Sequence, residues 1–212
     1  VATNNGVGMA SIANEATFQP YLTGFGCSPN SGYFSMSNSD FSKVYTHAIN
    51  NKVDILNMSF GDSARSSIVD EATKRAYNQG LFIVASRGNS GNTVANYPAC
   101  SEGALAVGAL NQYNEKASFS SYGDCGHGNY IMAYGQNVSV TVNGGVGTTN
   151  GTSFSSPIVA GVLGIMKSVN PNATNSALLQ ALKSTTKDLG VSGFHQTYGY
   201  GMIQPLEAVK KI

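Results

Sequence analysis

Residues 81–85 are all apolar, and this short run limits the choice of fold. A continuous apolar run of this length is typical of a β-strand covered on both faces. Residues 104–107 repeat the pattern, and residues 53–58 form a third short segment rich in apolar side chains. Strands of this kind occur mostly in parallel sheets with helices packed on both faces.

Helical patterns alternate with these strands. Residues 39–51 predict an amphipathic helix, because apolar side chains recur there at helical spacing: Phe41, Val44, Tyr45, Ala48 and Ile49. Residues 68–79 predict a second helix, which ends at Gly80. Two more helices are expected at residues 153–169 and 174–187. The alternation predicts an α/β fold with a mostly parallel sheet.

Two stretches are less regular. Residues 18–25 predict a strand, and the irregular loop after it extends to residue 38. Residues 118–146 are rich in Tyr, Gly and Val, and they predict short, partly antiparallel strands. Internal repeats and linkers are absent from the sequence, so we expect residues 1–212 to form one domain.

The composition argues against several classes of partner. Charged residues make up 11% of the chain and the net charge is +1, whereas a globular domain has about 25% charged residues. Neither nucleic acid nor an anionic membrane is expected as a partner. The longest apolar run, residues 158–166, is shorter than the roughly 20 residues of a membrane span. The surface is then built from small polar residues, as is common in secreted proteins.

Two loops carry candidate chemistry. Residues 150–157 place Ser153 on a Gly-containing turn that opens a buried helix. Its N–H would lie among the unpaired donors of the helix start, which suits a nucleophile whose reaction passes through an oxyanion. Residues 86–91 follow a predicted strand and aim the Asn89 amide, a candidate oxyanion donor, from between glycines. Taken alone, each loop is also an ordinary turn.

Together, five segments resemble the subtilisin-like serine proteases, or subtilases, in the order of that family. Residues 151–161 are similar to the nucleophile motif, and residues 85–89 to the segment that supplies an oxyanion-hole asparagine. Residues 54–61 resemble a strand whose end forms a wall of the primary specificity pocket. The other two are residues 117–123 and 198–203. The resemblance covers nearly the whole chain and implies a three-layer subtilisin-like fold, with helices on both faces of a mostly parallel sheet.

The resemblance implies a reaction and the residues that perform it. Ser153 would be the nucleophile of a serine endopeptidase and would carry the acyl group. The Ser153 N–H and the Asn89 side-chain amide would form the oxyanion hole.

The resemblance also implies the residues that bind the peptide or protein substrate. An extended substrate would pair with the backbone of Ser59, Phe60 and Gly61, as an added strand. The side-chain pocket would be lined by Ser86, Arg87, Gly88 and Asn96. Family members often have a glycine at the position of Asn96, so we expect a shallower or more polar pocket than one built for large aromatic side chains. Arg87 stands where small residues are usual, and the sequence offers no reason for it.

The cysteines and one N-terminal loop suggest further features. Cys100 and Cys125 lie in neighbouring loops and could form a disulfide worth roughly 3 kcal/mol; three free thiols are the alternative. An odd count leaves Cys27 without an assigned partner. The loop at residues 5–9 resembles a structural calcium site of the family, whose oxygen ligands would be the Asn5 side chain and the Val7 and Met9 carbonyls. A plain Gly-rich turn is the alternative for this loop.

The general base is missing from the motifs. Subtilases carry their catalytic aspartate and histidine before the loop that resembles residues 4–9. We therefore expect this chain to be N-terminally incomplete, with Asp and His either on a companion N-terminal chain separated by cleavage or in a segment that this sequence does not include. The histidines of this chain do not resemble the family's base, because His47 lies in a predicted helix and His127 and His195 lie in loops.

Two functions follow from these expectations. The first is a secreted serine endopeptidase that is completed by the companion segment. The second is a catalytically inactive subtilase-like module for binding or structure, because Ser153 without a base would not be activated. The missing segment should also supply core strands, and a chain without them would expose the edge of its sheet. This favours the first function.

Overall fold

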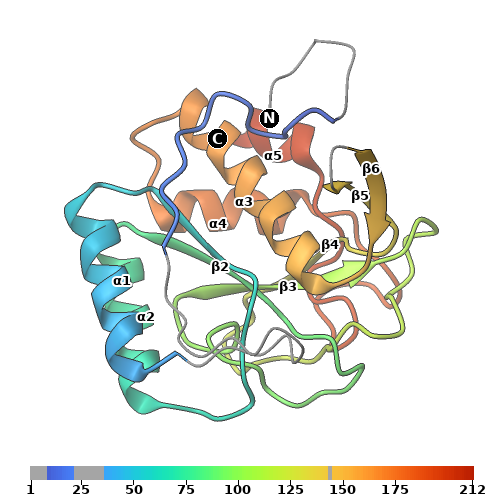
Figure 1. Cartoon of the computed structure of the whole chain (residues 1–212). Helices are drawn as coiled ribbons and strands as arrows, with labels where there is room; N and C mark the ends of the chain where they lie inside the picture. Colours follow the sequence, from blue (N-terminus) through green and yellow to red (C-terminus); the bar gives the residue numbers. More distant parts are fainter. Residues whose placement is uncertain (1–8, 22–35, 143–144) are drawn as a thin grey trace.

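A four-stranded parallel sheet forms the centre of the molecule, with the strand order β1-β2-β3-β4 (Figure 1). The computed structural model describes residues 9–21, 36–142 and 145–212. The strands are Ile55–Met58 (β1), Phe82–Ser86 (β2), Ala104–Leu110 (β3) and Tyr130–Tyr134 (β4). The first three confirm the strands expected from the apolar runs. Val84, in β2, lies opposite both Asn57 of β1 and Leu105 of β3.

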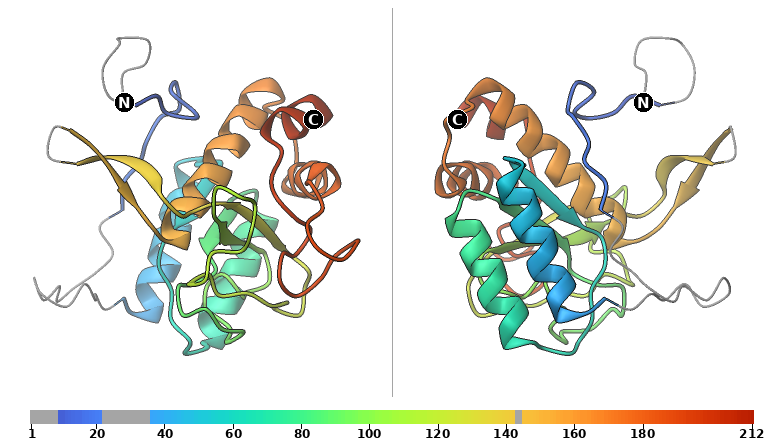
Figure 2. Two further views of the ribbon diagram at one scale, coloured as in Figure 1. Left: turned by 90° about the vertical axis from the view of Figure 1, so that its right-hand side faces the viewer. Right: turned by 60° about the vertical axis from the view of Figure 1, so that its left-hand side comes forward.

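Helices cover both faces of the sheet, as the α/β prediction required. The helices Asn38–Asn50 (α1) and Ser67–Asn78 (α2) lie together on one face (Figures 1 and 2). The other face is covered by three helices: Thr152–Val169 (α3), Asn175–Thr185 (α4) and Pro205–Lys211 (α5). Alternate residues of each strand point to opposite faces of the sheet, and each face has its own hydrophobic core. Phe82 and Val84 pack toward α3, whereas Ile83 and Ala85 pack toward α1 and α2.

Local side-chain chemistry determines where the helices begin and end. Ser37 caps α1 and exchanges hydrogen bonds with Asp40, so this helix starts one residue earlier than expected. Thr174 caps α4. That helix ends before the predicted residue 187, because Lys187 instead pairs with Met202. The short helix α5 was not predicted.

The strand predicted at residues 18–25 is not present in its described part. Residues 18–21 form no strand, and residues 22–25 lie outside the described residues. The Phe18 side chain is 86% exposed, so it packs on no sheet. The outer edge of β1 correspondingly has no partner strand among the described residues.

Residues 118–149 contribute both parallel and antiparallel strands. The antiparallel hairpin of Val138–Val142 (β5) and Gly145–Thr149 (β6) confirms the prediction of antiparallel pairing, and it projects from the body of the molecule (Figure 2). The preceding strand, β4, joins the parallel sheet.

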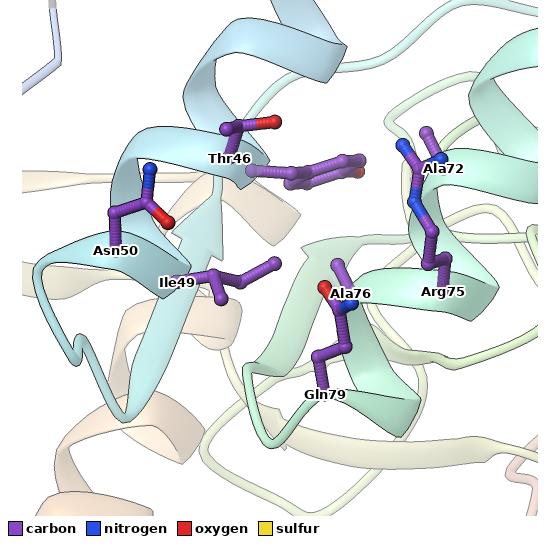
Figure 3. Close-up of a pocket in the computed structure, with 8 residues that line it drawn as sticks. Thr46, Ile49, Asn50, Ala72, Arg75, Ala76 and Gln79 are labelled. Atoms are coloured by element: carbon purple, nitrogen blue, oxygen red, sulfur yellow. The ribbon is translucent and has the colours of Figure 1, made fainter.

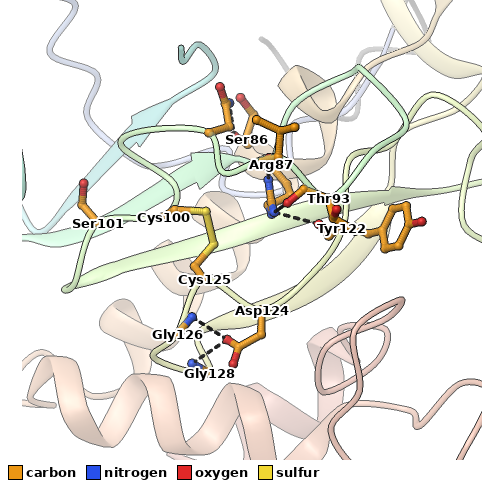
Figure 4. Close-up of a disulfide and its surroundings, with 12 residues drawn as sticks. Ser86, Arg87, Thr93, Cys100, Ser101, Tyr122, Asp124, Cys125, Gly126 and Gly128 are labelled. Atoms are coloured by element: carbon orange, nitrogen blue, oxygen red, sulfur yellow. Dashed lines mark hydrogen bonds between the residues drawn. A yellow bond between two sulfur atoms is a disulfide. The ribbon is translucent and has the colours of Figure 1, made fainter. Parts of the chain in front are cut away.

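A disulfide joins Cys100, before β3, to Cys125, before β4 (Figure 4). This confirms the predicted pair, and Cys27 lies outside the described residues. By length and composition α3 could cross a membrane. Its buried residues instead pack on β2, β3 and β4 in the core.

Candidate active site

Ser153 is the second residue of α3 and follows a turn that requires glycine. Gly151 has a φ of +149°, which L side chains rarely adopt, and its N–H donates to the Gly135 carbonyl at 2.8 Å. Thr152 then begins the helix. The Ser153 N–H has no partner among the described residues, as expected for the first turn of a helix. The nucleophile predicted from the sequence therefore carries a free backbone donor.

Two reciprocal hydrogen bonds join Ser153 to the end of β1. The Ser153 Oγ donates to the Ser59 carbonyl at 3.0 Å, and the Ser59 Oγ donates to the Ser153 carbonyl at 2.9 Å. Pro157 explains the second bond. In an α-helix the residue at position 157 would donate its N–H to the carbonyl of residue 153, and proline has no N–H. The Ser59 hydroxyl takes the place of that missing donor.

Asn57 and Ser156 extend this contact, and the sequence analysis did not identify either residue. The Asn57 Nδ2 donates to the Ser59 Oγ at 2.9 Å. The Ser156 Oγ donates to the Asn57 Oδ1 at 2.8 Å. The spacing of Ser153 and Ser156, three residues apart on a helix, was the available signal that both face the same neighbour.

Asn89 is held by the first residue of α3. Its Oδ1 accepts hydrogen bonds from the N–H and the Oγ1 of Thr152, both at 2.9 Å. The Asn89 Nδ2 makes no hydrogen bond within the described residues, and it would lie 3.6 Å from a Cβ placed on Gly151. Thr152, which the sequence analysis missed, thus leaves the amide donor free beside the nucleophile's turn. The oxyanion-hole role stays a prediction.

The Asn96 side chain fills the space between the ends of β1 and β2. A Cβ placed on Gly61 would overlap the Asn96 Nδ2, and a Cβ on Gly88 would lie 3.4 Å from the same atom. The Nδ2 donates to the Ser86 carbonyl at 3.3 Å. The structure therefore brings three predicted pocket residues, Ser86, Gly88 and Asn96, together with Gly61 of the predicted substrate edge. The Asn96 amide fills space that a glycine at position 96 would leave empty. Their role in substrate binding stays a prediction.

Arg87, the remaining predicted pocket residue, is buried. Its side chain is 1% exposed, and its guanidinium donates to the carbonyls of Val94 and Tyr122 (Figure 4). Burial lowers the pKa of the Arg87 guanidinium. Phe60, the remaining residue of the predicted substrate edge, is half-buried and packs against Phe41 at a ring-centroid distance of 6.1 Å.

All three histidines belong to the described residues, and none of them contacts Ser153. The His47 Nδ1 lies 3.3 Å from the Tyr21 hydroxyl. The His195 Nε2 lies 2.6 Å from the Leu189 carbonyl. Both ring nitrogens of His127 are buried without a partner. The Ser153 hydroxyl therefore has a carbonyl, and not an imidazole, as its hydrogen-bond partner.

A groove of about 1020 Å³ lies between the outer edge of β1, the neighbouring face of α3 and the segment of residues 11–21. Its lining is mostly apolar, and Phe60, Phe154 and Pro157 lie at the end nearest the nucleophile. Ser153 and Ser59 do not line the groove, although each directly precedes a residue that does. The strand edge also offers unpaired backbone donors and acceptors to a polypeptide lying in this groove.

A second, smaller cavity of about 410 Å³ lies between α1 and α2 (Figure 3). None of the candidate site residues lines it. Of the predicted calcium ligands, Asn5 and Val7 lie outside the described residues, and Met9 is half-buried at the start of the first described segment. Within the described ranges, no cluster of three or more His, Cys, Asp or Glu side chains is placed to bind a metal.

Comparison with known families agrees with this geometry. The profile of the subtilase family, peptidase S8, matches residues 1–201. The chain belongs to the subtilase family. Subtilisin Savinase from Lederbergia lenta is 34% identical over 210 residues, which are 99% of this subtilase chain and 74% of Savinase. The family resemblance of the five motifs is thereby confirmed.

Other relatives are longer than this subtilase. The minor extracellular protease Epr from Bacillus subtilis is 39% identical over 159 residues, which cover 74% of this chain and 24% of Epr. Alkaline elastase YaB from Bacillus sp. is 35% identical over 210 residues, which cover 99% of this chain and 52% of YaB. The chain thus spans between about a quarter and about half of the lengths of these two proteins.

Solved structures confirm the fold. The prenylagaramide maturation protease PagA superposes with a TM-score of 0.74 at 26% identity, over 84% of this subtilase and 68% of PagA. The PatG macrocyclase superposes with the same TM-score at 22% identity, over 83% of this chain and 56% of PatG, which shows the fold alone. The expected three-layer subtilisin-like fold is therefore correct.

Proposed function

We propose that the protein is a secreted serine endopeptidase that forms its acyl-enzyme on Ser153. The observation that carries the proposal is the pair of unpaired donors beside the nucleophile, the Ser153 N–H and the Asn89 Nδ2. Two donors of this kind suit an oxyanion, which develops on the substrate carbonyl when the hydroxyl attacks. Membership of a protease family adds to this support.

We infer that the general base comes from outside this chain, as an Asp–His pair on a companion N-terminal segment. Ser153 donates to the Ser59 carbonyl, and none of the chain's histidines contacts it. The groove along β1 would accommodate such a segment, because it combines an open strand edge with apolar walls. A histidine carried beside Phe154 would replace the Ser59 carbonyl as the hydrogen-bond partner of Ser153.

The reaction then proceeds in two steps, acylation of Ser153 and hydrolysis of the acyl-enzyme. The Ser153 Oγ attacks the peptide carbonyl carbon and gives its proton to the imidazole, while the oxyanion accepts hydrogen bonds from Asn89 and the Ser153 N–H. The imidazolium protonates the leaving amine as the C–N bond breaks. A water molecule then attacks the acyl carbon and gives a proton to the imidazole. The bond from the acyl carbon to the Ser153 Oγ breaks, the imidazolium returns its proton to that oxygen, and the acid leaves.

Substrate binding in this proposal uses the two strand ends. An extended peptide pairs with the backbone of residues 59–61, and its P1 side chain enters the space beside Gly61 and Gly88. Because the Asn96 amide occupies much of that space, the pocket favours small or polar P1 side chains. A peptide library ranked by P1 residue tests this, and a clear preference for Phe or Tyr would contradict it.

A catalytically inactive binding or structural module is the second candidate. The hydrogen bond from the Ser153 hydroxyl to a backbone carbonyl favours it, since this arrangement leaves the nucleophile without a proton acceptor.

Labelling of the isolated protein with a fluorophosphonate separates the two functions. An active protease gains one adduct on Ser153, and denaturing mass spectrometry finds a second chain that carries Asp and His. Ser153→Ala is the matched control and takes no adduct. A single unlabelled species of 22.1 kDa would instead support the inactive module.

Secretion and a calcium site complete the proposal. The disulfide, the low charged fraction and the extracellular relative Epr all support secretion. For calcium we retain Asn5, Val7 and Met9 as ligands on the strength of the family resemblance. Thermal unfolding with calcium and with a chelator tests the site, because a ligand that binds only the folded state raises its stability. An equal Tm in both would remove calcium from the proposal.

A further inference from the structure

Arg87 is the most deeply buried charged side chain in the described part of the protein, and the proposed reaction does not use it. Its side chain is 1% exposed, and no carboxylate of the described residues pairs with it. The cost of burying a guanidinium is large unless its donors find acceptors. The acceptors that Arg87 finds indicate what it does.

Backbone carbonyls, rather than side chains, receive the Nη donors of Arg87, while its buried Nε has no partner among the described residues. The Nη1 donates to the Val94 carbonyl at 2.9 Å, and the Nη2 donates to the Tyr122 carbonyl at 2.7 Å. The Thr93 carbonyl lies 3.5 Å from the Nη2. One planar fork thus holds together two segments that are about thirty residues apart in the sequence.

The first of these segments leads directly into Asn96. Val94 lies two residues before Asn96. Tyr97, which directly follows Asn96, makes two backbone hydrogen bonds with Asp62, of 2.7 and 3.0 Å. The loop is therefore anchored on both sides of Asn96, to the segment after β1 on one side and to Arg87 on the other. Between the anchors, the Asn96 amide lies against Gly61 and Gly88.

We propose that Arg87 is a positioning residue for substrate specificity, which holds the loop of residues 93–97 so that the Asn96 amide stays in the P1 pocket. This rests on the proposed function, since it requires the space beside Gly61 and Gly88 to receive the P1 side chain. The guanidinium does not contact the substrate, because it is buried and its Nη donors already bind the carbonyls of Val94 and Tyr122. This role explains why an arginine stands at a position where small residues are usual.

Arg87→Met is the main test, because methionine fills similar space and lacks the donors. All variants carry Ser153→Ala, so that peptide binding is measured without hydrolysis. The measurement is the ratio of the dissociation constants of two tetrapeptides that differ only in P1, Phe over Ala. The isolated protein, with any co-purifying chain retained, is used throughout.

The parent should bind the Ala peptide about tenfold more tightly than the Phe peptide, the scale on which a pocket discriminates by size. Arg87→Met should lower this ratio about three- to tenfold, and Arg87→Lys should restore part of it, since an ammonium still offers donors to the carbonyls. Arg75→Met, which replaces an exposed arginine on α2, should leave the ratio unchanged.

A double-mutant cycle shows whether Arg87 acts through Asn96. Asn96→Gly should reduce or reverse the ratio by itself, and adding Arg87→Met to it should then have no further effect. A purely structural role for Arg87 would lower stability in both backgrounds without changing either ratio. That result would overturn the proposal.

Amide hydrogen exchange of residues 93–97 gives a readout that needs no peptide. Arg87→Met should speed exchange there by about tenfold or more relative to Arg75→Met, because fewer bonds hold the loop. Unchanged exchange would overturn the anchoring by Arg87 even if the protein proves to be a protease. A third outcome is faster exchange in Arg87→Met together with no peptide binding by any variant. It would show that the space beside Gly61 and Gly88 does not receive a P1 side chain, and it would overturn both this specificity role and the proposed function.

Discussion

Pro157 links the chemistry of one residue to the geometry of the nucleophile. It removes the donor that would bond to the Ser153 carbonyl within α3, and the Ser59 hydroxyl from the end of β1 replaces that donor at 2.9 Å. The start of α3 is thereby bonded to the end of β1 at Ser153, the proposed nucleophile. Thr152 makes the equivalent tie to Asn89.

At the residue scale, the two atoms of the Asn89 amide have separable tasks. Asn89→Asp keeps an oxygen for Thr152 but removes the Nδ2 donor and adds a negative charge, so kcat should fall by about 100- to 1000-fold or more while stability is largely kept. Asn89→Ala also removes the acceptor for two hydrogen bonds and should destabilise the fold by about 1–2 kcal/mol as well. Peptide hydrolysis and urea unfolding measure the two effects. Equal stability of both variants would show that the Thr152 contacts contribute little.

At the element scale, α3 has the largest structural role, since its buried residues pack on the sheet and its first turn carries Ser153. The prediction of a buried helix there is confirmed. The strand predicted at residues 18–25 is wrong in its described part, because residues 18–21 pair with no strand of the sheet even though β1 lies at its edge. Propensity within a short segment does not report whether the segment pairs with a neighbouring strand.

Leu163 tests the packing of α3. Its side chain is completely buried between this helix and the sheet, so Leu163→Ala should lower the free energy of unfolding by about 2–5 kcal/mol. Leu206→Ala, at a site 64% exposed on α5, is the matched control and should change it by less than about 0.5 kcal/mol. Urea unfolding of both variants measures the difference. A small effect at Leu163 would mean that the core closes around the missing side chain.

At the scale of the whole molecule, helices cover both faces of the sheet at β2 and β3, while β1 has no partner strand among the described residues along the 1020 Å³ groove. The groove and the nucleophile lie beside each other. A segment that fills the groove would therefore contribute to the fold and to the reaction together.

The disulfide acts on the chain as a whole. Cys100 and Cys125 are 25 residues apart, and closing such a loop restricts the unfolded chain by about 3 kcal/mol. The double substitution of both cysteines by serine should lower the free energy of unfolding by about that amount, as measured by urea unfolding without reductant. The parent in reductant should show a similar loss. Unchanged stability in both would mean that the bond does not form in solution.

The Cys100–Cys125 pair was one of two alternatives that the sequence left open. The alternation of the three buried strands with helices, and the nucleophile turn, followed from the sequence, because each depends on periodicity or on a local motif. Asn57, Thr152 and Ser156 did not, since their roles depend on which strand end meets the start of α3. The purpose of Arg87 was also invisible in the sequence. The partners of Arg87 are backbone carbonyls, and every residue has one. Which carbonyls it binds depends on the tertiary structure, which brings two distant segments to the same guanidinium.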